Sequence, residues 1–111
     1  MSHELNKSKS FELLAKRQRR LLLRIVQEAS APLPMAELAK QIGEREYDNP
    51  STSELESIRL SLFHNHVPKL ERADVVMYYE DEDTVYTAEN FAALVGMLKK
   101  VENGGIPRTR E

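Results

Sequence analysis

The sequence predicts one mainly helical α+β domain, and two observations carry this prediction. Apolar residues recur at three-, four- and seven-residue spacing in four separate segments, which is the pattern of amphipathic helices. Between the third and fourth segments, two runs rich in valine, threonine and tyrosine flank an acidic turn, which is typical of a β-hairpin. The length of 111 residues suits a single domain with its own core.

The first helix is expected to run from Ser10 to Ala29. Ser10 suits the N-cap position, because a serine hydroxyl accepts a hydrogen bond from a free amide of the first turn. Leucines recur along one face of this segment, while Arg17, Arg20 and Arg24 follow the same period on another face. One face is therefore expected in the core and the other at the surface.

Two further helices are expected before the hairpin. The second follows Pro34, a residue suited to the first turn of a helix, and Leu33 before it is expected to form a very short strand. The third covers about Glu54–Ala73, with Thr52 or Ser53 as its cap.

The third helix is expected to be apolar over more than half of its circumference. Leu60, Phe63, Val67 and Leu70 form one apolar line at helical spacing. Pro68 lies within this helix and is expected to kink it, since proline has no amide hydrogen to donate.

The hairpin and a last helix complete the predicted fold. The hairpin strands are expected at about Val75–Tyr79 and Thr84–Thr87, around the acidic tip EDED of residues 80–83. A C-terminal helix is expected over residues 89–102, with an apolar stripe on one face.

Three helices followed by a hairpin is the order of the winged helix-turn-helix, in which the third helix usually enters a DNA groove. We therefore predict a winged helix-turn-helix with three helices, a two-stranded β-hairpin wing and a C-terminal helix. The domain is expected over residues 10–102, after a basic flexible tail of residues 1–9 and before a disordered tail of residues 103–111.

Two stretches, RQRRLLLRIVQEASAPLPMAELAKQI and SLFHNHVPKLERADVVMYYEDEDTVYTAE, carry a resemblance to a known family. The chain resembles a family of small haloarchaeal winged-helix proteins of uncharacterised function over about residues 17–88. The most specific part is the segment from His66 to Leu70. Asp74 stands where that family usually has a glycine in a left-handed turn, a conformation that aspartate tolerates. The resemblance implies a winged helix and a transcriptional regulator.

The charge of the chain is unevenly distributed. Its formal net charge is −2, but residues 1–30 hold seven Lys and Arg against three acidic residues. The excess of negative charge therefore lies in residues 31–111. A basic first segment favours a polyanionic partner on one face of the protein. We therefore predict binding to double-stranded DNA.

Two groups of residues are candidates for this binding. Small hydroxyls, an imidazole and an amide suit base edges, and Lys and Arg suit phosphates. The base-facing candidates are Ser57, Ser61, His64 and Asn65. The phosphate-facing candidates are Lys16, Arg17, Arg20, Arg24, Arg59 and Lys69.

Other functional classes find little support in the sequence. His64 and His66 lie about 200° apart on a helix, so they do not converge on one metal ion. His66 is expected to be a packed, hydrogen-bonded core residue. No nucleophile motif or Gly-rich phosphate loop is present, so we expect no enzyme activity, metal or cofactor. Cysteine is absent and no apolar run approaches membrane-spanning length, so we expect a cytoplasmic protein.

Two alternatives stay open at this point. The C-terminal helix is expected to form a homodimer interface through Phe91, Leu94, Leu98 and Val101, or else to close the core of one subunit. The acidic hairpin tip would repel phosphate, which favours a winged-helix protein–protein interaction module that does not bind DNA directly and docks another regulatory protein. We retain DNA binding as the first hypothesis.

Overall fold

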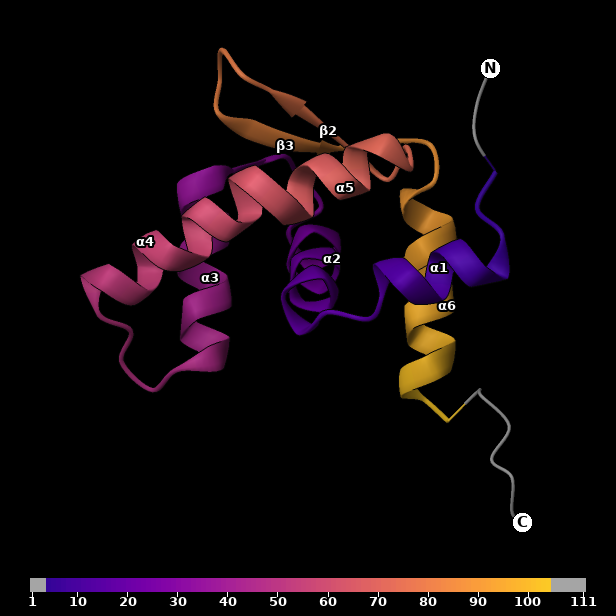
Figure 1. Cartoon of the computed structure of the whole chain (residues 1–111), viewed down its shortest axis with the longest axis horizontal. Coiled ribbons are helices and arrows are strands. Elements are labelled where there is room, and N and C mark those ends of the chain that lie inside the picture. The colour runs from indigo at the N-terminus through magenta and orange to yellow at the C-terminus, as the bar shows by residue number, and fades with distance from the viewer. Residues whose placement is uncertain (1–3, 105–111) are drawn as a thin grey trace.

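The computed structural model describes residues 4–104 of the chain (Figure 1). Over these residues the protein is mainly helical with a small three-stranded antiparallel sheet, so the predicted α+β class is confirmed. The elements are α1 (Lys7–Leu13), α2 (Arg17–Ala29), β1 (Leu33–Pro34), α3 (Met35–Glu46), α4 (Thr52–Ser61), the π-helical segment η1 (Leu62–His66), α5 (Val67–Arg72), β2 (Val76–Tyr79), β3 (Thr84–Thr87) and α6 (Phe91–Glu102). Within this part of the chain, no helix has the length and apolar character needed to cross a membrane. Most of the predicted tail of residues 103–111 lies outside the described residues.

The segment predicted as one helix from Ser10 to Ala29 forms two helices. α1 begins earlier than expected, because the side-chain oxygen of Asn6 accepts a hydrogen bond from the amide of Lys9 at 2.7 Å and caps the helix there. Ser10, the predicted cap, is buried inside α1. α1 therefore includes residues 7–9 of the stretch 1–9, which the sequence predicts as a flexible tail.

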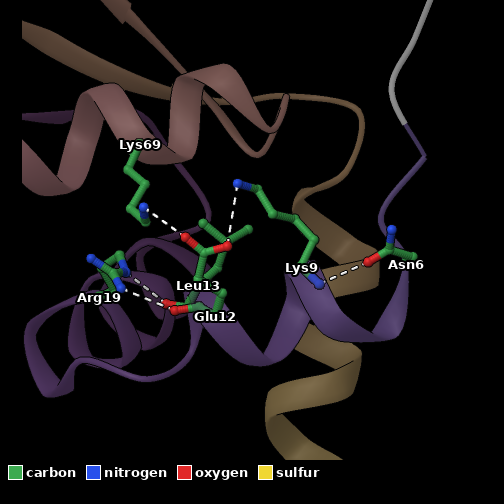
Figure 2. A network of polar contacts seen from close by, with 6 residues as sticks. All are labelled: Asn6, Lys9, Glu12, Leu13, Arg19 and Lys69. Carbon is green, nitrogen blue, oxygen red and sulfur yellow. Dashed lines mark hydrogen bonds and ion pairs between the residues drawn. The ribbon is translucent and has the colours of Figure 1, made fainter.

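The break between α1 and α2 is held by two arginine side chains. Arg19 donates to the backbone carbonyls of Leu13 at 2.7 Å and Glu12 at 3.0 Å (Figure 2), and Arg20 donates to the carbonyl of Leu14 at 2.8 Å. The last carbonyls of a helix have no partner within it. The guanidinium groups supply those partners, so α1 ends where α2 folds back on it.

α4, η1 and α5 join into one helical rod, residues 52–72, which corresponds to the predicted third helix (Figure 1). The rod begins with a capping box. The hydroxyl of Ser51 accepts from the amide of Glu54 at 3.1 Å, and the Glu54 carboxylate accepts from the amide of Ser51 at 2.9 Å. The cap therefore lies one residue before Thr52, the nearer of the two predicted caps.

The π-helical segment η1 ends at His66, two residues before Pro68. Proline cannot donate to the carbonyl four residues earlier, and a π-helical turn is one way in which a helix accommodates that loss. The expected distortion at Pro68 therefore takes the form of a wider turn within a continuous rod. Such a turn holds roughly one residue more than an α-helical turn, which rotates the two halves of the rod relative to each other.

This rotation separates the predicted apolar line on the rod. Val67 and Leu70 are buried, whereas Leu60 is 44% exposed and Phe63 is 39% exposed. Constant helical spacing does not hold across η1, so the prediction that all four residues face one side is wrong. Two large apolar side chains are left at the surface of the rod.

The sheet has the strand order β1-β3-β2. Val85 pairs with Leu33 of β1 on one side and with Tyr78 of β2 on the other. The predicted short strand at Leu33 and the predicted hairpin are both confirmed. Asp74 has a φ of 59°, which matches the left-handed conformation expected between the rod and the hairpin.

α6 closes the core of the single chain and packs against α2. Phe91, Leu94 and Leu98 belong to the main hydrophobic cluster and are 8%, 0% and 2% exposed, while Val101 is half-buried. These three buried side chains have no surface to offer a second copy. Of the two alternatives for the stripe Phe91, Leu94, Leu98 and Val101, the burial of its first three residues favours the one in which the helix closes the core of one subunit. The homodimer stays a prediction.

Candidate nucleic-acid interface

An open hollow of about 340 Å³ lies where the N-terminus of α2 meets the rod. Its lining residues are Lys16, Arg17, Gln18, Ser61, Asn65 and His66. The hollow thus brings two predicted base-facing residues, Ser61 and Asn65, together with two predicted phosphate-facing residues, Lys16 and Arg17. Ser57 and His64 are also exposed on the rod, outside this lining.

The α2 side of the hollow is positively charged. Lys16 is the N-cap residue of the 13-residue helix α2, and no side chain caps this end. The free amides and the helix dipole therefore add to the charge of the two cations. Lys16 and Arg17 are both exposed, and neither forms an ion pair with another residue in the described part of the chain, although Arg17 donates to the backbone carbonyl of Arg45 at 3.3 Å. This end of α2 is suited to an anionic partner.

The other four predicted phosphate contacts are engaged within the chain. Arg24 pairs with Glu102, Arg59 with Asp83 at 3.4 Å and Lys69 with Glu12 at 2.8 Å (Figure 2), while Arg20 donates to a backbone carbonyl. Ion pairs between partly exposed side chains are weak, typically about 0–1 kcal/mol. Their main effect here is to neutralise cations that the sequence assigns to phosphate.

His66 forms the inner wall between the hollow and the core. It is 5% exposed, and its Nδ1 lies 3.1 Å from Nη1 of Arg19. A guanidinium group only donates, so Nδ1 is the acceptor and the proton of the neutral imidazole is on Nε2. Burial, together with the charges of Arg19 and Lys16, lowers the pKa of His66 to about 4. The expectation of a packed, hydrogen-bonded core histidine is confirmed.

Arg19, which is not among the predicted phosphate contacts, is a buried residue of this region. Its side chain is only 4% exposed, and burial lowers the pKa of its guanidinium group. Helical spacing indicates the burial of Arg19. It precedes Leu22, Leu23 and Val26 by three, four and seven residues, so it lies on the buried face of α2. Among the neighbouring arginines Arg17, Arg19 and Arg20, Arg19 is therefore a structural residue of the core, whereas Arg17 is exposed at the surface.

In the view of Figure 1, the β2–β3 hairpin and α2 lie on opposite sides of the rod, and the N-terminus of α2 lines the hollow. Asp83 accepts from the hydroxyl of Tyr78 and pairs with Arg59, and the Glu82 carboxylate accepts from the hydroxyl of Tyr86 at 2.6 Å. The hydrogen bond to Asp83 is the main reason that the pKa of Tyr78 is raised to about 12. Glu80 and Asp81 are exposed. The negative charge of the tip is thus spatially separated from Lys16 and Arg17.

The two rod histidines do not form a metal centre. His64 is exposed while His66 is buried beside Arg19. Among residues 4–104, no three His, Cys, Asp or Glu residues are grouped so that they could hold a metal ion.

A family model described as a domain of unknown function (DUF7344) matches residues 11–86 of the chain. The matched segment runs from α1 to the middle of β3, so it contains both sides of the hollow and most of the hairpin. No curated protein and no solved structure gives a significant match.

Proposed function

The chain belongs to the family of the domain of unknown function DUF7344, and we propose that it is a sequence-specific DNA-binding transcriptional regulator of the winged helix-turn-helix type. The order of elements supports this proposal: α2, α3 and the rod are followed by the β2–β3 hairpin. In this proposal the rod is the recognition helix and the hairpin is the wing.

The observation that carries the proposal is the hollow between α2 and the rod. Ser61 and Asn65 offer hydrogen-bonding groups that match base edges, and Lys16 and Arg17 lie beside them with exposed positive charge. Recognition of duplex DNA needs both kinds of group close together, because phosphate contacts orient the protein and base contacts specify the sequence.

The arrangement favours one orientation on the duplex. With the rod in the major groove, the N-terminus of α2 would contact the phosphate backbone along one groove edge, as helix N-termini do at anions. The acidic hairpin tip, on the other edge of the rod, would point away from the nearest phosphates. Ser57 and His64, exposed on the rod, would extend the base-facing surface.

A salt titration with duplex DNA tests the proposal. Each phosphate contact contributes about −0.9 to the slope of log K against log salt, so two unpaired cations predict a slope of about −2, whereas six would give about −5. Replacing Lys16 and Arg17 by glutamine should reduce the slope to near zero. Arg24→Gln is the matched control, since Arg24 is already paired with Glu102, and it should leave the slope unchanged. Absence of binding at low salt would contradict the proposal.

A second candidate is a winged-helix protein–protein interaction module that does not bind DNA. It is favoured by the internal pairing of Arg24, Arg59 and Lys69, and by the exposed carboxylates of Glu80 and Asp81. The same titration separates the two candidates, because an interaction module would show no binding at any salt concentration. The homodimer expected from the sequence stays a prediction without an assigned surface.

A further inference from the structure

Leu60 and Phe63 form an exposed apolar pair in the middle of the rod. They lie three residues apart, on neighbouring turns, and are 44% and 39% exposed. On the α2 side of the rod the neighbouring side chains are polar, with Ser61 and Asn65 in the hollow. The proposed reading face therefore carries large apolar groups beside hydrogen-bonding groups.

The Phe63 ring is held in one place. It packs edge-to-face against the imidazole of His64, with ring centroids 5.0 Å apart, and against the ring of Tyr78 from the hairpin, at 5.9 Å. A ring fixed from two sides loses little conformational freedom on binding, which favours recognition. The hairpin thus orients a side chain of the rod.

The size of the pair argues against a protein partner as its occupant. A stable protein interface buries about 800 Å² on each partner, whereas this pair offers two side chains that are each less than half exposed. A smaller apolar group with a polar neighbour fits better. In the major groove, thymine presents such a group, since its C5-methyl lies beside the O4 acceptor.

We propose that Leu60 and Phe63 contact thymine C5-methyl groups in the major groove and are specificity-determining residues of this protein. The inference rests on the proposed DNA-binding function and deepens it, because it names the feature of the duplex that the rod recognises. The hydroxyl of Ser57 and the ring of His64 are also exposed on the rod, and in this proposal they donate to the adjacent O4 or to a neighbouring base.

The test uses the full chain and duplexes selected by the wild-type protein from a random-sequence pool. Each thymine of a selected duplex is replaced singly by deoxyuridine, which removes only the C5-methyl group. At one or two positions we expect binding to weaken about fourfold, the effect of removing one buried methyl group. Leu60→Ser and Phe63→Ser should bind the thymine and deoxyuridine duplexes equally at those positions.

Two comparisons keep the outcomes distinct. Phe11→Ser changes a ring that is 42% exposed on α1, which is a different element from the rod, and should retain the wild-type preference for thymine. Leu60→Ser keeps the test decisive if Phe63→Ser unfolds, because the ring packing between the rod and the hairpin is made by Phe63 and Tyr78 and is left intact by this substitution. If the protein selects duplexes but no deoxyuridine replacement weakens binding, the inference about thymine is wrong while the proposed DNA binding stands. That outcome would favour Leu60 and Phe63 as a contact for a protein partner. Failure to select any duplex would overturn the proposed function, and the inference with it.

Discussion

Arg19 and His66 connect three helices through one buried contact. Arg19 of α2 holds the last carbonyls of α1 and donates to His66 of the rod at 3.1 Å. A buried guanidinium is costly unless its donors find acceptors, and here two carbonyls and an imidazole nitrogen accept from it. The neutral form of His66 is therefore part of the packing between α1, α2 and the rod.

Stability should fall in mild acid because of His66. Its pKa is about 4 in the folded protein and about 6.5 when unfolded, so the unfolded chain binds the extra proton between these values. The stabilising contribution is complete above the unfolded pKa and decreases as the pH falls toward 4. From pH 7.5 to pH 5 the free energy of unfolding should decrease by about 2 kcal/mol from this group. Urea unfolding followed by circular dichroism measures it.

The matched variant for this prediction is His66→Gln. Its amide oxygen can still accept from Arg19, but the side chain does not titrate. Glu12 and Glu28 also have lowered pKa values, because they pair with Lys69 and Arg45 respectively, but their contributions are lost below about pH 4.5. The interval above pH 5 therefore isolates His66. An equal loss of stability in His66→Gln and the wild type would contradict the assignment.

The rod is the element in which local chemistry and tertiary packing diverge most clearly. Its start has a sequence signature, since Ser51 and Glu54 form the S-x-x-E pattern of a capping box. The middle of the rod has no comparable sequence signature. The distortion associated with Pro68 extends over the five residues of η1, and the spacing of apolar residues does not indicate it. Helical periodicity therefore predicts the existence of the rod and misplaces Leu60 and Phe63 on it.

A cap substitution distinguishes the observed rod start from the predicted one. Ser51→Ala should lower the free energy of unfolding by about 1 kcal/mol, since it leaves the amide of Glu54 without its acceptor. Ser53→Ala, at a position that the sequence also offers as a cap, should change it by no more than about 0.3 kcal/mol, within the usual range for surface positions. Urea unfolding of the two variants checks this. A larger loss of stability in Ser53→Ala than in Ser51→Ala would indicate that Ser53, one of the predicted caps, begins the rod.

The break between α1 and α2 shows a second limit of local sequence. The linker carries no proline or glycine, and both flanks have helical spacing. α1 ends where the side chains of Arg19 and Arg20 donate hydrogen bonds to the carbonyls of Leu13 and Leu14. These contacts exist only once the chain has folded. The class of fold, the hairpin and its neighbouring short strand are predictable, because strand propensity and turn chemistry are local. Contacts made by folded-back side chains are not.

For the molecule as a whole, α6 decides whether the chain has one closed core or an exposed apolar stripe. Leu94 and Leu98 are buried against the rest of the same chain, and the small residues Ala92, Ala93 and Gly96 are exposed. The site described above lies at the N-terminus of α2, whereas α6 packs against α2 in the core. α6 thus supports the site indirectly by fixing the position of α2.

Leu98→Asp tests this role of α6. A carboxylate at a 2% exposed core position has no partner, so we expect a loss of more than about 4 kcal/mol in the free energy of unfolding and loss of the helical circular dichroism signal. Ala93→Asp, on the exposed face of the same helix, should keep the wild-type spectrum and the wild-type mass in light scattering. If Leu98 instead lay between two copies, Leu98→Asp would stay helical and its mass would fall to half of the wild-type mass. A core position yields unfolding, and an intersubunit position yields a folded monomer.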